Sequence, residues 1–409
     1  MSTYVLAVFC VVYLGMILGG LPFLQLDRTG IALLGAIALV GAGAVTPEQA
    51  ARSVHLPTLL LLFAFMVLSA QMRLGGFYSW VTRRVAAAEV SPPALLALLM
   101  GVVAALSAVF SNDVVCLAVA PVLADACLRR RLDPLPFLLG LACAANIGSA
   151  LTLIGNPQNM LIGETLGLSF SGYVAEALVP VLAGLALTWT ILVLQVRGRW
   201  RQEGPAERAL PERREGESLD PWQTAKGLAI AGALLLVFLF TSWPREVAAL
   251  VGAGLLLLSR RLHSSRMLGL VDWELLVLFI GLFVVNHAIQ ETGLTAWAVA
   301  ELAEAGVPLR DPGTLFAATF VLSNIVSNVP AVMLLLPVAT DPLAGPMLAL
   351  VSTLAGNLLI VGSIANIIVV DAAARQGIRI TWQRHVRVGL PVTLATLAVT
   401  AGWLWLRWH

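Results

Sequence analysis

Asparagines are concentrated in a few apolar stretches of this chain. The sequence contains nine of them, and eight lie in or beside stretches that are otherwise nonpolar: Asn112, Asn146, Asn156, Asn159, Asn324, Asn328, Asn357 and Asn366. A side-chain amide offers two donors and one acceptor without a net charge, which suits a hydroxylated solute or an ion that has lost its water. Because buried amides need hydrogen-bond partners, the clustering predicts a polar site enclosed by apolar helices.

Two of the asparagine-containing runs should interrupt helices. The run Gly155-Asn156-Pro157-Gln158-Asn159 combines glycine, which permits unusual backbone angles, with proline, which lacks an amide hydrogen. The run Gly362-Ser363-Ile364-Ala365-Asn366 should act in the same way, but more weakly. Half-helices that begin at such breaks direct the positive ends of their dipoles at the site, and unwound carbonyls can bind a cation. The alternative is that these amides only cap the breaks and pack helices.

Asp113 follows Ser111 and Asn112 midway along the apolar stretch 92–128. A carboxylate at the centre of a bilayer costs roughly 2.5 to 3.5 kcal/mol on insertion scales, and such residues usually serve a function. We therefore predict that Asp113, together with Ser111, carries the coupling proton or cation. The alternative is that the carboxylate only caps the half-helix that follows it.

The predicted solute site gathers the amides and hydroxyls at these interruptions. Its residues are Asn112, Asn146, Asn156, Asn159, Ser327, Asn328, Asn357, Ser363 and Asn366. Glu164, Asp371 and His287 are further candidates for proton relays, but each acid could instead pair with a nearby arginine, and the histidine could be a core residue. The sequence offers no nucleophile with a base, no metal-ligand constellation and no nucleotide motif. Neither an enzyme, a metal site nor a cofactor is expected.

The composition requires a membrane around these residues. The chain has 409 residues, of which 59% are hydrophobic and 12% are charged, and its mean hydropathy is +0.90. Apolar segments must therefore fill most of the sequence, and the lipid bilayer is the predicted partner of the outer surface. The formal net charge of +2 is too small to indicate a nucleic-acid partner.

Stretches of about 20 apolar residues predict spanning helices. The predicted spans are 4–24, 30–45, 55–72, 134–166, 172–196, 222–242, 245–259, 273–290, 345–376 and 386–407. Two further stretches, 92–128 and 312–340, are interrupted midway by Ser111-Asn112-Asp113 and Ser327-Asn328. A single spanning helix would place those polar groups in hydrocarbon, whereas a re-entrant hairpin buries the turn inside the protein. We predict a hairpin for each stretch.

The two halves of the chain repeat each other. Arg28 and Gly35 match Arg245 and Gly252, and Gly76 and Trp80 match Gly293 and Trp297, every pair at an offset of 217. A longer motif recurs at an offset of 216. In the first half it consists of Leu106-Ser107, Ser111-Asn112 and Pro121-Val122, and in the second half of Leu322-Ser323, Ser327-Asn328 and Pro337-Val338. After a length change, Asn146 matches Asn357, Gly155 matches Gly362, and Asn159 matches Asn366. The repeat covers nearly the whole chain.

The arginines between apolar stretches indicate how the halves are threaded. Clusters at 83–84, 129–131, 197–226, 260–266 and 375–387 can all be cytoplasmic in one threading, with five spans and one hairpin in each half. An odd number of spans inverts the second half relative to the first. We thus predict an all-α polytopic protein of the inner (plasma) membrane with a first inverted repeat over 1–196, a cytoplasmic linker over 197–221 and a second inverted repeat over 222–409. Inverted repeats with discontinuous helices are typical of secondary transporters.

Four groups of residues resemble the arsenite-efflux permease family of the ion transporter superfamily. They are Ser111-Asn112-Asp113-Val114-Val115-Cys116; Ala145-Asn146-Ile147-Gly148-Ser149 with Ile154-Gly155-Asn156-Pro157-Gln158-Asn159; Ser327-Asn328-Val329-Pro330; and Ala355-Gly356-Asn357 with Gly362-Ser363-Ile364-Ala365-Asn366. The resemblance covers the chain from about residue 28 to its end and is closest to the branch of plant silicic-acid efflux transporters.

The resemblance implies a homodimeric antiporter that exports a small inorganic oxyacid, arsenite or silicic acid, in exchange for protons. The moving part would be each hairpin with the broken span that follows it. The alternative is a sodium-coupled importer of a small dianion, a dicarboxylate or sulfate, because more distant relatives bind sodium and carboxylates through Ser-Asn-Thr at both hairpin tips. Here the tips read Ser-Asn-Asp and Ser-Asn-Val, and no basic residue stands beside Asn328 or Asn366. A channel is disfavoured, because a pore needs no paired gates.

Overall fold

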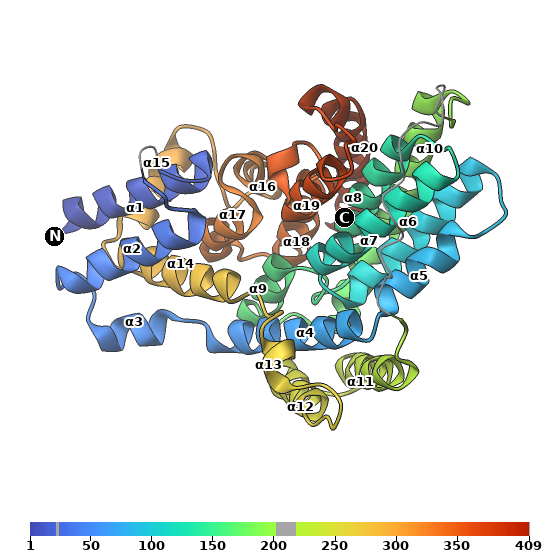
Figure 1. The fold of residues 1–409 in the computed structure, drawn as a ribbon. Coiled ribbons are helices and arrows are strands. Elements are labelled where there is room, and N and C mark those ends of the chain that lie inside the picture. The colour runs from blue at the N-terminus through green and yellow to red at the C-terminus, as the bar shows by residue number, and fades with distance from the viewer. Residues whose placement is uncertain (22–23, 202–217, 409) are drawn as a thin grey trace.

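The computed structural model describes residues 1–21, 24–201 and 218–408, and helices account for nearly all of the regular structure there (Figure 1). Most of the predicted linker, residues 202–217, lies outside the described residues. The helices of the first half are α1 (Ser2–Leu18), α2 (Arg28–Gly41), α3 (Pro47–Ser53), α4 (Leu56–Leu74), α5 (Phe77–Ala86), α6 (Pro92–Val109), α7 (Asn112–Arg129), α8 (Pro134–Ser149), α9 (Pro157–Thr165) and α10 (Phe170–Val196).

The second half follows the same order. Its helices are α11 (Pro221–Phe240), α12 (Arg245–Leu257), α13 (Ser264–Leu268), α14 (Trp273–Glu291), α15 (Leu294–Glu304), α16 (Pro312–Val326), α17 (Asn328–Leu335) with the 3-10 turn η1 (Leu336–Val338), α18 (Ala344–Ala355), η2 (Ile360–Gly362), α19 (Ile364–Ala374) and α20 (Trp382–Trp408). Each helix from α1 to α10 thus has a counterpart from α11 to α20. The starts of α2 and α12, of α4 and α14, and of α5 and α15 are 217 residues apart.

The last helices of the two halves run antiparallel, as an inverted repeat requires. Near the end of α10, Gln195 Nε2 donates to the carbonyl oxygen of Arg387 near the start of α20 at 2.8 Å. Near the start of α10, Glu176 pairs with Arg407 near the end of α20 at 2.6 Å. The predicted fold class, an all-α protein of two inverted repeats, is confirmed.

Both predicted hairpins are present. α6 and α7 pack against each other and are separated only by Phe110 and Ser111, and α16 and α17 are separated only by Ser327. Ser327 adopts φ 76° and ψ 161°, a conformation that is almost confined to glycine. This strained backbone lies at the tip of the second hairpin, whereas its counterpart Ser111 has an ordinary φ of −56°.

Both predicted breaks are present too. The first separates α8 from α9 and covers residues 150–156, and the second separates α18 from α19 and covers residues 356–363. Asn156 caps α9, because its side chain accepts a hydrogen bond from the backbone amide of Asn159, and Ser363 caps α19 through the amide of Ala365. The caps satisfy amides that a helix start leaves free.

Three of the predicted spans form helices that are too short to cross the bilayer. Six helices among the described residues are long and apolar enough to cross a membrane, namely α4, α6, α10, α11, α14 and α20. The stretches predicted as spans 4–24, 30–45 and 245–259 form the shorter helices α1, α2 and α12. At 1.5 Å per residue, the 14 residues of α2 extend about 21 Å, less than the roughly 30 Å of hydrocarbon.

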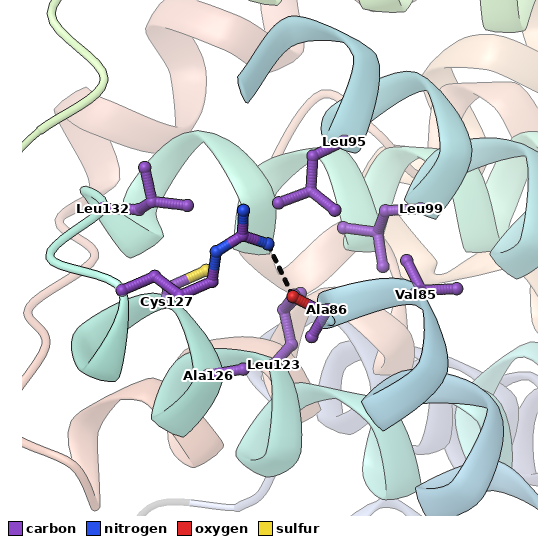
Figure 2. Close-up of a pocket in the computed structure, with 9 residues that line it drawn as sticks. Val85, Ala86, Leu95, Leu99, Leu123, Ala126, Cys127 and Leu132 are labelled. Atoms are coloured by element: carbon purple, nitrogen blue, oxygen red, sulfur yellow. Dashed lines mark hydrogen bonds between the residues drawn. The ribbon is translucent and has the colours of Figure 1, made fainter. Parts of the chain in front are cut away.

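Helices α3, α5, α13 and α15 were missed because none is a long apolar run. α5 carries Arg83 and Arg84 in its last turn, and α15 contains Glu301 and Glu304. The end of α5 is held against the first hairpin, because Arg130 Nη1 donates to the carbonyl oxygen of Ala86 at 2.5 Å, the dashed line in Figure 2. The pocket drawn there is lined mainly by apolar side chains from α5, α6 and α7, so it is a packing gap rather than a polar site.

Gly148 allows α8 to lie directly against α6. A Cβ at Gly148 would overlap the backbone of Ala104, whereas a Cβ at Gly101, also on α6, would meet no atom within 4 Å. We expect Gly148→Ala to lower the free energy of unfolding by about 1–3 kcal/mol, because overpacking forces helices apart. Gly101→Ala should leave stability unchanged or raise it slightly. Thermal unfolding in detergent, followed by tryptophan fluorescence, compares the two variants; equal midpoints would contradict this packing.

Candidate solute-binding site

Asn146 on α8 is the centre of a buried amide cluster. Its Oδ1 accepts hydrogen bonds from Asn112 Nδ2 at 3.1 Å and from Ser363 Oγ at 2.9 Å. Its Nδ2 donates to Asn357 Oδ1 at 3.0 Å and to Asn366 Oδ1 at 3.1 Å. All five side chains are buried. Two of these residues come from the first half and three from the second, so the cluster joins the first hairpin tip to the second break.

A second cluster surrounds the first break. Asn156 Nδ2 donates to Ser149 Oγ and to Thr353 Oγ1, both at 3.1 Å. Thr353 Oγ1 in turn donates to Asn159 Oδ1 at 3.3 Å, and Asn159 Nδ2 donates to the hydroxyl of Tyr173 at 3.2 Å. Because Thr353 lies on α18, this cluster also joins the two halves. α9 and α18 lie near the middle of the molecule (Figure 1).

The first hairpin tip touches the first break directly. The backbone N–H of Asn112 donates to the carbonyl oxygen of Gly155 at 3.3 Å. The side-chain hydroxyl of Thr152 donates to the carbonyl oxygen of Ala108 at 2.5 Å. Gly155 has no space for a side chain, because a Cβ there would overlap the carbonyl oxygen of Ser149. The two asparagine clusters therefore border one continuous polar region between the hairpin tip and both breaks.

The second hairpin tip is joined to this region less closely. The Oδ1 atoms of Asn324 and Asn328 are buried and accept no hydrogen bond. A Cβ at Gly362, in the second break, would lie 3.5 Å from Asn324 Oδ1, so this amide faces the break. Within the described residues, Ser327 and Asn328 form no side-chain hydrogen bond with the other predicted site residues. Their place in the solute site stays a prediction.

Unpartnered oxygen atoms recur at equivalent positions of the two halves. They are Ser107 Oγ and Asn112 Oδ1 in the first hairpin and Ser323 Oγ and Asn328 Oδ1 in the second. Both pairs are related by the offset of 216 that the sequence repeat has here. A buried polar atom without a partner costs about 1–3 kcal/mol, and such atoms are rare in native structures. Their repetition marks equivalent polar positions at the two hairpin tips.

Asp113 lies in the first turn of α7 and is partly exposed. Among the described residues, none of the ion pairs closer than 4 Å involves it. Its side chain is also not the cap of α7, since that position belongs to Ser111, which makes no capping hydrogen bond. Asp113 therefore has no fixed cation beside it among the described residues, and its coupling role stays a prediction.

The acids that were weaker candidates for relays both pair with arginines. Glu164 pairs with Arg245 at 2.9 Å, and Asp371 pairs with Arg375 at 2.7 Å. The arrangement matches the alternative interpretation, in which they bind a nearby arginine. His287 on α14 is partly buried.

Sequence reasoning missed several residues of the polar region. Thr353, Ser149, Thr152 and Tyr173 complete the second cluster, and His385 Nε2 lies 3.2 Å from the carbonyl oxygen of Asn357. Serine and threonine in apolar helices usually bond to their own backbone, so their types gave no signal. Ser107 and Ser323 did carry a signal, because both belong to the repeated motif.

Two inverted repeats, each with a re-entrant hairpin and a helix broken beside it, define a multi-pass membrane transporter. The chain belongs to the CitMHS citrate transporter family, whose sequence model matches residues 4–355. It is 28% identical to an uncharacterized transporter of Mycobacterium tuberculosis over 94% of this chain and 95% of that protein. It is 27% identical to the silicon efflux transporter LSI3 of rice, over 92% of each chain.

A solved structure has a similar fold. The YdaH transporter of Alcanivorax borkumensis, described as having an unusual topology, matches with a TM-score of 0.54 over 100% of this chain and 98% of its own. The two sequences are 13% identical, so this likeness concerns the fold alone.

Proposed function

We propose that the protein is a secondary active transporter that exports a small inorganic oxyacid, arsenite or silicic acid, by proton antiport. The observation that carries this proposal is the amide cluster around Asn146, which is built from both halves and contains no charged side chain. Both solutes are neutral hydroxides near neutral pH, and amides match hydroxyl groups as donors and acceptors. The similarity to the rice silicon efflux transporter supports the same solute class.

Asp113, with Ser111 beside it, is the proposed proton carrier. A carboxylate that takes up a proton on one side of the membrane and releases it on the other converts the proton gradient into work on the solute. One charge that crosses 100 mV is worth about 2.3 kcal/mol, which sustains a solute gradient of about fiftyfold. The exchange of one proton for each solute molecule is therefore sufficient to drive export against a solute gradient of this size.

In the proposed cycle, an elevator-like motion carries the site across the membrane. Each hairpin and the broken helix after it move together, and the remaining helices form the scaffold. We place the protein in the inner (plasma) membrane as a homodimer, and each protomer consists of the repeats 1–196 and 222–409. The linker 197–221 lies on the cytoplasmic side, because the arginine clusters then all face the cytoplasm.

A second candidate function is sodium-coupled import of a small dianion. The unpartnered oxygens of Ser107, Asn112, Ser323 and Asn328 favour it, because oxygen ligands at both hairpin tips suit two dehydrated cations. The family description as citrate transporters also points to a carboxylate. Against it stands the Asn146 cluster, to which no arginine or lysine of the described residues donates a hydrogen bond.

Flux measurements in proteoliposomes separate the two functions. An inside-acid pH gradient or an inward sodium gradient is imposed, and uptake of arsenite, germanic acid as a surrogate for silicic acid, succinate and citrate is followed. The proposal expects proton-dependent uptake of the oxyacids and none of the carboxylates. Sodium-dependent uptake of succinate or citrate, without oxyacid uptake, would establish the second function instead.

A further inference from the structure

A buried ion pair joins the first broken helix to the scaffold. Arg245 Nε at the start of α12 lies 2.9 Å from Glu164 Oε1 near the end of α9, and the two side chains are only 14% and 9% exposed. Arg245 Nη2 also donates to the carbonyl oxygen of Gly163 at 2.9 Å. Glu164 and Arg245 are the counterparts of Asp371 and Arg28 in the other half, because α9 and α19 start 207 residues apart and α2 and α12 start 217 residues apart.

The counterpart pair is not formed. Arg28 Nε donates to the carbonyl oxygen of Met16 at 3.2 Å. Asp371 pairs with Arg375 one turn along its own helix, and its side chain is 57% exposed. Equivalent positions of the two halves therefore differ. Glu164 on α9 and Arg245 on α12 form an ion pair, whereas their counterparts Asp371 on α19 and Arg28 on α2 are separated.

The packing of the two halves differs in the same elements. α2 packs against α14 and α12 packs against α4, and these scaffold contacts are alike. α9, however, packs against α4, whereas its counterpart α19 has no comparable packing against α14. The difference thus lies between the scaffold and the broken helices. In an inverted-repeat transporter, alternating access exchanges the conformations of the two halves, so an asymmetry of this kind marks one of two related states.

We propose that Glu164–Arg245 and Asp371–Arg28 are alternative latches, each closed in one of the two states of the transport cycle. The proposal rests on the proposed function only in assuming alternating access. These four are positioning residues, because none of them touches the amide clusters. Arg245 Nη2 bonds to the carbonyl oxygen of Gly163, whereas neither Glu164 Oε1 nor Arg245 Nη1 has a well-directed hydrogen bond, so charge attraction holds the carboxylate in the closed latch. A contact of this kind can open when its charges reach water, as Asp371 does here.

Distances between spin labels test the exchange without any transported solute. Cysteines at Thr165 and Val247 report the first latch, and cysteines at Ala374 and Leu33 report the second, in a background where the exposed Cys10 is replaced by serine. The measured quantity is the population with the first latch closed divided by the population with the second latch closed. Glu164→Gln should lower this ratio by about fivefold or more. Arg28→Met should shift the same ratio in the opposite direction, and the charge exchange Glu164→Arg with Arg245→Glu should restore it.

Glu176→Gln is the matched control, because it also removes an interhelical ion pair, with Arg407, but within the paired helices α10 and α20. It should leave the ratio unchanged. Shifts in the same direction for Glu164→Gln and Arg28→Met, or no shift in either, would overturn the latches. The distances are measured without a proton gradient or a solute, so this result does not depend on whether the proposed solute and coupling ion are correct. A single distance population at both label pairs would instead argue against alternating access.

Discussion

Asp113→Asn should abolish uphill transport while the protein stays folded. Asparagine has nearly the same shape as aspartate but cannot carry a proton, so the pH gradient loses its connection to the solute. Within the described residues Asp113 has no ion-pair partner, and the substitution leaves no cation unpaired. With an inside-acid proton gradient equivalent to about 100 mV, the accumulation ratio of arsenite or germanic acid in proteoliposomes should fall from as much as about fiftyfold to about one.

The control for this variant is Asp125→Asn. Asp125 is also acidic and lies on α7, but it is remote from the hairpin tip, partly exposed and paired with Arg129. It should retain proton-driven accumulation. If Asp113→Asn accumulates solute as the unmodified protein does, Asp113 is not the proton carrier; if both variants lose accumulation, the effect is not specific to the hairpin tip.

Asn146→Leu should nearly eliminate transport and also destabilise the protein. Leucine has a similar volume but would leave Asn112, Ser363, Asn357 and Asn366 without their shared partner. Each buried polar group left unpaired costs about 1–3 kcal/mol, so we expect unfolding to become easier by about 2 kcal/mol or more and flux to fall by about a hundredfold. Initial rates in proteoliposomes and thermal unfolding in detergent measure the two effects.

Thr188→Val provides the comparison for Asn146→Leu. Thr188 is completely buried, but its hydroxyl donates only to the carbonyl oxygen of Gly184 on the same helix. Its replacement should change flux and stability little. A loss of stability in Asn146→Leu with normal flux would mean that the cluster only holds the two halves together.

The repeat, the hairpins and the breaks could be predicted because polar residues in apolar stretches are rare and specific. Ser111-Asn112 and Ser327-Asn328 mark turns that hydrocarbon does not tolerate, and Gly155 with Pro157 marks a backbone that cannot stay helical. In each case the interruption follows from the backbone chemistry of a few residues, without knowledge of their neighbours.

The contacts across the two halves could not be predicted in the same way. That Asn146 meets Asn357 and Asn366, or that Thr353 joins Asn156, depends on how α8 and α18 cross, and this is decided by side-chain packing over the whole interface. Helices α5 and α15 could not be predicted as spans because both are short and carry charged residues, so neither forms a long apolar run.

The position of bound arsenite, from the anomalous scattering of arsenic in crystals of the protein, shows whether the solute binds at the Asn146 cluster. Because thiols bind trivalent arsenic, the experiment uses a variant with all four cysteines, Cys10, Cys116, Cys127 and Cys143, replaced by alanine. We predict one anomalous peak within hydrogen-bond distance of the amides of Asn146, Asn357 or Asn366. A peak remote from these amides, with no arsenic between the two halves, would mean that the Asn146 cluster does not bind the solute.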